Sequence, residues 1–254
     1  MSALADAGAP LLDLLFPPRC VACGTRGAVL CGECRARIQP PAPPRCPRCG
    51  APLPGEGLRC AVCAAGHSPQ ALDHLIAASV YAGTARKAIL ALKFEGQRRV
   101  ARPLGELLAA AVREAGERPD VIVPVPLHHS RLRARGYNQA ELLARRCARL
   151  LGIPCRTDVL VRTRATPPQV GLSLVDRRRN IAGAFALAGG SRAAALTGQC
   201  IALLDDVATT SSTLDAAATA LRGAGPAAIL GLAVARTERP DDDMAPMARE
   251  RSAR

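Results

Sequence analysis

Tryptophan is absent from this 254-residue chain, and its aromatic side chains are limited to three Phe and two Tyr. The core must therefore be built from Ala, Leu, Val and Ile, and rows of aromatics for stacking on nucleic acid are lacking. No apolar run approaches the roughly 20 residues that span a bilayer. The start of the chain carries Asp6 and Asp13 and lacks the basic segment of an export signal. We therefore expect a cytoplasmic protein without membrane insertion, beginning with a short amphipathic helix over residues 11–16.

Lysine is almost absent, occurring only at Lys87 and Lys93, yet the chain is strongly basic. Lys and Arg total 34 against 21 Asp and Glu, which gives a formal net charge of +13. Polyanions are plausible partners for such a chain. Because the arginine excess also fits a bias in genomic base composition, charge alone is weak evidence for nucleic-acid binding.

Cysteine is concentrated near the N-terminus, where eight of the eleven cysteines form four C-x-x-C pairs. Each pair can place two thiolates on one tetrahedral ion, and eight sulfurs complete two zinc sites. A disulfide framework is the alternative, which the lack of an export signal disfavours. Four sulfurs leave no open position for water, so the expected zinc is structural. The expected ligands are Cys20, Cys23, Cys31, Cys34, Cys46, Cys49, Cys60 and Cys63.

Sequential pairing, with the first four cysteines on one ion and the last four on the other, is the simpler assignment. A crossed arrangement is also possible. The sequence PPAPP at residues 40–44 predicts a stiff spacer between the two sites. We expect a double zinc ribbon over residues 15–66.

Alternating strand and helix patterns begin at residue 72 and continue to residue 236, followed by a polar tail at 237–254 that we expect to be disordered. Alternation of this kind predicts an α/β domain with a parallel sheet. Strands are expected at 75–83, 121–126, 200–206 and 227–235, and helices at 84–94, 100–115, 138–152 and 213–225.

Ligands of parallel α/β sheets bind beyond the carboxyl ends of the strands. Two stretches there carry suitable chemistry. VPVP at 123–126 leads into a basic stretch with His128 and His129, which we expect to be loop surface. LLDDVATTSST at 203–213 joins an acid pair to a hydroxyl-rich turn before a helix, where backbone N–H groups and the helix dipole can hold an anion.

LLDDVATTSST resembles the phosphoribosyl pyrophosphate (PRPP) loop of type I phosphoribosyltransferases. The whole chain resembles the ComF family, which contains ComFC-like competence proteins and GntX-like proteins. The resemblance covers roughly residues 15–236 and is carried by the cysteine pairs, LKFEG at 92–96, VPVPLHHSRLRARGYNQAELLA at 123–144, VRTRATPPQVGLSLVDRRRNIAGAF at 161–185 and the acidic loop.

The resemblance implies a PRPP site that works with Mg²⁺. Asp205 and Asp206 would accept hydrogen bonds from the ribose hydroxyls and act in catalysis, and the turn from Thr209 to Thr213 would hold the 5′-phosphate. The full set of implied PRPP-binding residues is Asp205, Asp206, Val207, Ala208, Thr209, Thr210, Ser211, Ser212, Thr213, Pro124, Val125, Pro126, Arg131, Arg135, Asn138 and Gln139. Gln169, Arg178 and Asn180 match a further family pattern.

Two functions remain open on the sequence. One is an enzyme that transfers a phosphoribosyl group to a nitrogen nucleophile. The other is a non-catalytic protein of the same fold that assists DNA uptake by binding single-stranded DNA or a helicase-type partner. For Arg131, Arg133 and Arg135 the simplest alternative is a solvated basic surface. Ser211 stands where the PRPP loop usually has glycine, so a positive φ at this position would strain the backbone.

Overall fold

The computed structural model describes residues 17–53, 55, 59–64, 66, 69–166 and 174–237. The helix expected over residues 11–16, Gln169 and the tail beyond residue 237 lie outside the described residues. In the described ranges, no helix is both long enough and apolar enough to cross a membrane.

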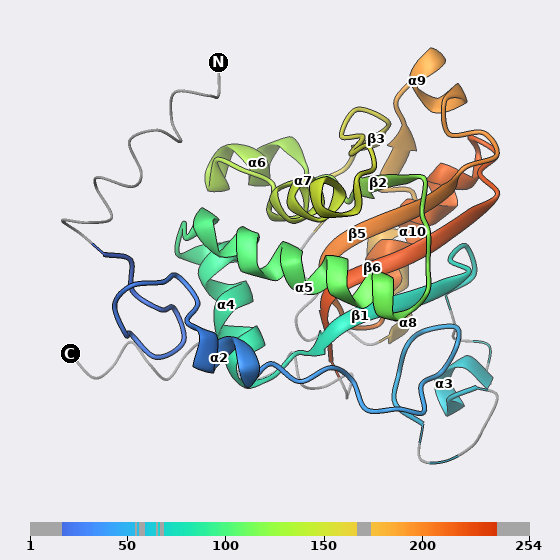
Figure 1. Cartoon of the computed structure of the whole chain (residues 1–254). Helices are drawn as coiled ribbons and strands as arrows, with labels where there is room; N and C mark the ends of the chain where they lie inside the picture. The colour runs from blue at the N-terminus through green and yellow to red at the C-terminus, as the bar shows by residue number, and fades with distance from the viewer. Residues whose placement is uncertain are drawn as a thin grey trace.

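A four-stranded parallel sheet with the order β1-β6-β5-β2 forms the centre of the molecule (Figure 1). The expected fold class, a parallel α/β sheet behind a cysteine-rich N-terminal part, is therefore confirmed. The strands are β1 (His74–Val80), β2 (Val121–Pro124), β5 (Cys200–Ala208) and β6 (Ala228–Arg236).

Helices cover both faces of this sheet (Figure 1). Helices α4 (Gly83–Phe94), α5 (Ala101–Glu114) and α7 (Gln139–Leu151) lie on one face, with a short 3-10 helix (Arg98–Val100) before α5. Helix α10 (Ser212–Arg222) packs on the other face together with α8 (Leu174–Ile181). The chain is therefore a three-layer α/β/α sandwich.

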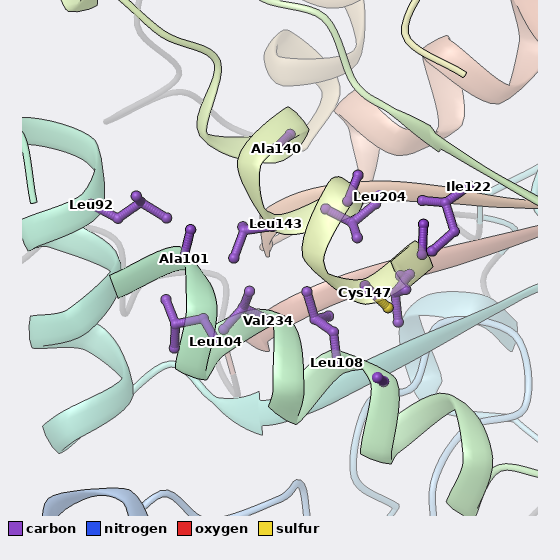
Figure 2. Close-up of a cluster of buried hydrophobic side chains, with 14 of the residues drawn as sticks. Leu92, Ala101, Leu104, Leu108, Ile122, Ala140, Leu143, Cys147, Leu204 and Val234 are labelled. Carbon is purple, nitrogen blue, oxygen red and sulfur yellow. The ribbon is translucent and has the colours of Figure 1, made fainter. Parts of the chain in front are cut away.

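The alternation of side chains along β5 builds two cores. Ile201 and Leu203 point toward α10, whereas Ala202 and Leu204 point toward α5 and α7. Figure 2 shows the second core, in which aliphatic side chains from the helices meet those of the sheet without any aromatic among the labelled residues. The labelled residues are Leu92, Ala101, Leu104, Leu108, Ile122, Ala140, Leu143, Cys147, Leu204 and Val234. This agrees with a core built from small aliphatic residues.

The expected elements are confirmed with shifted ends, and one shift matters for the site. Strand β5 continues to Ala208 because its pairing with β6 continues to Arg236. Val207 and Ala208, assigned from the sequence to the phosphate loop, are strand residues. The loop therefore begins only at Thr209.

Several short elements were not predicted from the sequence. The basic stretch after β2, expected to be a loop, contains helix α6 (His129–Arg135), which ends at Gly136 with φ 77°. A two-stranded antiparallel sheet, β3 (Leu160–Arg162) with β4 (Phe185–Leu187), stands apart from the main sheet, and α9 (Ser191–Ala194) follows it. Elements this short carry too few residues to show a period.

Both edges of the main sheet are partly occupied by other segments. At the β1 edge, Val80 N–H donates to the carbonyl oxygen of Gln39, 2.9 Å away. At the β2 edge, Ile122 N–H donates to Pro154 at 3.0 Å, and Arg156 N–H donates back to Ile122 at 2.9 Å.

The N-terminal part holds α2 (Gly32–Ala36) and α3 (Ala61–Ala64) and contacts the sandwich at several places. Arg35 and Arg146 both lie 2.6 Å from the carboxylate of Glu106, which joins α2 to α5 and α7. Gly50, with φ 68°, passes so close to β1 that a Cβ would lie 2.8 Å from the Leu75 carbonyl oxygen. A side chain is excluded at this position.

Candidate functional site

The acid pair lies near the carboxyl end of β5, facing the last turn of α4. Asp206 Oδ1 accepts an ion pair from Lys93 Nζ at 2.9 Å, and only 4% of the Asp206 side chain is exposed. Its second oxygen, Oδ2, is buried without a hydrogen-bond partner among the described residues. Asp205 Oδ1 accepts from the backbone N–H of Asp206 at 2.8 Å. One carboxylate oxygen of Asp206 is thus fixed by an ion pair, while the other has no hydrogen-bond partner among the described residues.

Burial sets the protonation of this cluster. Burial, together with the neighbouring charge of Asp206, raises the pKa of Asp205 to about 7, although Lys93 opposes the shift. Burial disfavours the charged form of Lys93, but the carboxylates of Asp206 and Asp205 outweigh it and raise the pKa of the lysine. The ammonium group of Lys93 is therefore charged at neutral pH. The carboxyl group of Asp205, by contrast, titrates close to neutral pH.

The turn after β5 has a left-handed residue at its centre. Ser211 adopts φ 59° and ψ 10°, the only positive φ outside glycine in the described chain, and directly precedes α10. Its hydroxyl oxygen is buried and has no hydrogen-bond partner among the described residues. The left-handed geometry explains why glycine would suit this position, and places the first N–H groups of α10 at the turn.

Arginines from two elements line the same cavity as the acids. Arg131 and Arg135 come from α6, and Arg162 comes from β3. Burial and the positive charge of Arg131 lower the pKa of Arg162, which nevertheless stays protonated. Arg131 also donates to the Thr166 carbonyl oxygen at 2.8 Å. The carboxylate of Asp205 partly offsets the repulsion between these two guanidinium groups.

These groups border one cavity of about 630 Å³. It brings together residues from segments far apart in the sequence. The predicted site residues that line it are Val125, Arg131, Arg135, Gln139, Asp205, Asp206, Val207, Thr209 and Thr213. The predicted residues that do not line it are Pro124, Pro126, Asn138, Ala208, Thr210, Ser211 and Ser212.

Three of the residues outside the lining have evident partners. Asn138 caps α7 by accepting from Ala140 N–H at 3.0 Å, and its amide donates to the Val125 carbonyl oxygen at 3.0 Å. Thr210 and Ser212 share a hydrogen bond of 2.7 Å between their hydroxyl groups. These side chains hold the two loops in shape.

Several lining residues were not predicted from the sequence. Lys93, Arg162 and Thr166 border the cavity, as does Tyr81. Arg177 of α8, 3% exposed, donates to the Thr209 hydroxyl at 3.3 Å. The rarity of lysine and the LKFEG stretch were the signals in the sequence that could have identified Lys93. Arg162 and Arg177 could not be singled out because the chain contains many arginines.

The other residues singled out from the sequence, His128, Arg178 and Asn180, do not line this cavity. His128 is mostly buried rather than loop surface: its ring nitrogen accepts from Ser130 N–H and caps α6. Burial and the charges of His129 and nearby arginines lower its pKa. Arg178 borders a separate cavity of about 390 Å³ between α8 and α10, and Asn180 lies in α8.

The eight cysteines form two clusters in sequential pairing. Within each cluster the four sulfurs lie within 4.8 Å of one another. Sγ–Sγ distances of 3.7 Å for Cys23–Cys31 and 3.6 Å for Cys49–Cys60 match the edge of a tetrahedron with Zn–S bonds of about 2.3 Å. Both clusters fit structural zinc, and the crossed arrangement is excluded.

The second cluster contacts the main sheet through a charge. Arg236, the last residue of β6, places Nη2 3.7 Å from Cys49 Sγ. Arg236 also pairs in the sheet with Ala208, next to the turn at Thr209. A guanidinium beside a thiolate ligand stabilises the negative charge that four sulfurs bring to a zinc site.

Residues 11–66 match the double zinc ribbon domain family. The chain is 35% identical over 221 residues to Competence protein F of Haemophilus influenzae (strain Rd), covering 83% of this chain and 93% of that protein. The chain belongs to the family of Competence protein F. The ComF resemblance is thereby confirmed.

A second relative of the chain, the DNA utilization protein YhgH of Escherichia coli (strain K12), is 34% identical over 197 residues, or 76% of this chain and 84% of that protein. Among solved structures, the purine phosphoribosyltransferase from Pyrococcus horikoshii Ot3 aligns with 21% identity and a TM-score of 0.33, over 56% of this chain and 85% of that chain.

Proposed function

We propose that the cavity binds phosphoribosyl pyrophosphate together with Mg²⁺. The observation that carries the proposal is one cavity lined both by an acid pair, Asp205 and Asp206 (here the acidic wall), and by three arginines, Arg131, Arg135 and Arg162 (here the basic wall). PRPP carries partners for both, with ribose hydroxyls that donate to carboxylates and phosphates that accept from guanidinium groups.

On the acidic wall, Asp205 and Asp206 would accept from the ribose hydroxyls. Asp206 Oδ2, buried and without a partner among the described residues, fits an incoming hydroxyl donor. Lys93 holds the other oxygen, so the carboxylate is oriented before the ligand arrives. The turn from Thr209 to Thr213 would hold the 5′-phosphate through its N–H groups and hydroxyls, at the start of α10.

On the basic wall, Arg131, Arg135 and Arg162 would contact the pyrophosphate. Burial and the charge of Arg131 lower the pKa of Arg162 while Asp205 opposes the shift, and a bound pyrophosphate would add negative charge beside this guanidinium. Mg²⁺ supplies further charge neutralisation and is typically held by phosphate and ribose oxygens with few protein ligands. The acid pair and the three arginines therefore suit PRPP with a Mg²⁺ ion held mainly by PRPP itself.

Calorimetry of the full chain with PRPP and MgCl₂ tests the proposal. Arg131→Gln should weaken binding by about tenfold or more, because charged hydrogen bonds to phosphate are lost. Arg133→Gln is the matched control, since Arg133 lies on the same helix but does not border the cavity. The absence of binding at millimolar PRPP, or an equal loss in both variants, would refute the proposal.

The relatives named for competence and DNA utilization favour a role of this site in the uptake or use of DNA. Whether a phosphoribosyl group is transferred there is decided by measuring pyrophosphate release across a panel of nitrogen bases. Release with one base supports an enzyme. Loss of transformation in a deletion strain, restored equally by wild type and Asp206→Asn, supports a binding role without catalysis.

A further inference from the structure

Phe94 exposes its ring at the cavity. It is the last residue of α4, lines the cavity and is 58% exposed. By contrast, Tyr137 and Phe185 are 8% and 7% exposed. Single exposed apolar residues are common and by themselves indicate nothing. What distinguishes this ring is its position: Phe94 and Tyr81 are the two aromatic side chains that line the cavity, and Phe94 is the exposed one.

Contacts of the two residues before Phe94 fix the end of α4, which carries the ring. The residue before it, Lys93, is fixed by the ion pair with Asp206. Leu92 is fully buried, and its carbonyl oxygen accepts a hydrogen bond from the Tyr137 hydroxyl. Arg98 in turn packs over the Tyr137 ring, 4.6 Å from its centroid. The end of α4 is therefore preorganised, so a ligand that stacks on Phe94 orders little of the backbone.

A guanidinium group lies over the same ring. Arg135 Cζ lies 5.5 Å from the centroid of Phe94, and Arg135 also donates to Gln139 Oε1. Arg135, Gln139 and Phe94 all line the cavity. An aromatic face beside guanidinium donors and an amide provides stacking together with hydrogen bonds in one place, which suits a planar ligand carrying carbonyl or ring-nitrogen acceptors.

We propose that Phe94 is the stacking surface of a base-binding subsite, with Arg135 and Gln139 contacting the edge of the base. The ligand is a planar nitrogen heterocycle. This inference deepens the proposed function and rests on it, because the subsite occupies the same cavity as the acid pair. A base in this subsite would lie beside a PRPP molecule that contacts Asp205 and Asp206.

The same stacking chemistry would also accept a base of single-stranded DNA. Proteins that follow a strand stack successive bases on several aromatic side chains. Phe94 is the only large aromatic among the exposed hydrophobic residues of the described chain, the others being Leu132 and Val161. Tyr81 lies in the same cavity and is less exposed, so no row of exposed aromatics extends beyond the cavity in the described chain, and the structure favours a free base over a strand.

Titration of the full chain with adenine, hypoxanthine, guanine and uracil, with pyrophosphate and Mg²⁺ present, tests the subsite. At least one base should bind, and Phe94→Leu, which keeps an apolar side chain but removes the ring, should weaken it by about tenfold or more, as expected for one stacked base. Leu132→Ala is the matched control: Leu132 is 42% exposed on α6 and does not line the cavity.

A second variant reports base binding at the subsite directly by fluorescence, without comparing the affinities of two variants. Because the chain has no tryptophan, Phe94→Trp introduces a single indole at the subsite. Stacking of a base should quench its fluorescence, and a tryptophan placed at Leu132 should not respond. Thermal unfolding of each variant checks the fold.

Failure of the subsite and failure of the PRPP site are distinguishable. If Phe94→Leu leaves base affinity unchanged, or if a thymidine oligonucleotide binds through Phe94 while every free base fails, the subsite proposal is overturned and PRPP binding is untouched. If wild type binds a base in a Phe94-dependent manner but binds no PRPP, the subsite stands and the proposed function falls.

Discussion

Lys93 and Asp206 form an ion pair of 2.9 Å that joins the end of α4 to the end of β5. The lysine side chain is 22% exposed and that of the aspartate 4%, so the pair is largely withdrawn from water. The charge of the lysine is needed where it lies, because two adjacent carboxylates would otherwise repel one another in a buried place.

Replacement of Lys93 by Met should lower the free energy of unfolding by about 2–4 kcal/mol, because it leaves the buried charge of Asp206 without its partner. Urea denaturation measures the change. Lys87→Met, the matched change on the same helix, should cost less than about 0.5 kcal/mol because that ammonium group is exposed. The double variant Lys93→Met, Asp206→Asn should recover much of the loss; if it is no more stable than the single variant, the ion pair is not the cause.

Asp205→Asn should stabilise the protein more at pH 8 than at pH 5. The pKa of Asp205 is raised to about 7 in the folded chain, above the value of about 4 in an unfolded chain. The folded state therefore holds this proton more tightly, and its stability falls as the pH rises from about 4 through about 7. Asparagine keeps the oxygen that accepts from Asp206 N–H and removes the charge.

Thermal unfolding of wild type and Asp205→Asn at the two pH values measures this difference. An equal difference at both values would show that the Asp205 carboxyl does not titrate in this range.

Ser211→Gly should raise the free energy of unfolding by about 1 kcal/mol, because glycine adopts φ 59° without the strain that a side chain imposes there. We also expect tighter PRPP binding, if the Cβ crowds the phosphate. Ser212→Gly is the control, since Ser212 begins α10 and its hydroxyl bonds to Thr210; it should destabilise. Unchanged PRPP affinity in Ser211→Gly would mean that the serine is accommodated.

Purified protein should carry about two zinc ions per chain, one for each set of four cysteines. Cys23→Ser and Cys49→Ser should each reduce the metal content to about one, and elemental analysis under reducing conditions measures it. Arg236→Gln should speed the release of zinc from the second cluster to a chelating dye while leaving the first cluster unchanged. A metal content near zero in wild type, or equal effects on both clusters, would contradict these expectations.

The sequence predicted the parts of the site that lie close together along the chain. The cysteine spacing defined both metal clusters, and the acidic loop located Asp205, Asp206 and the turn at Ser211. The anomaly of a serine at a glycine position was visible as well, and the φ of 59° explains it.

The remaining residues could not be predicted because their roles depend on tertiary contacts. Lys93 meets Asp206 across more than a hundred residues, and Arg162 comes from a strand of only three residues. Arg177, one of three consecutive arginines, faces Thr209 because of the direction in which α8 lies. Asn138 was assigned to the ligand, yet its side chain braces the loop after β2.

The segments at the two edges of the sheet have a consequence for aggregation. An open edge strand offers unpaired N–H and C=O groups to the strands of other molecules. Here the β2 edge is protected by the chain's own α7–β3 connection, but the β1 edge is protected by Gln39 and Gly50, which belong to the cysteine-rich part. The cysteine-rich part therefore covers the β1 edge, and we expect removal of metal from its two clusters to expose that edge to pairing with other molecules.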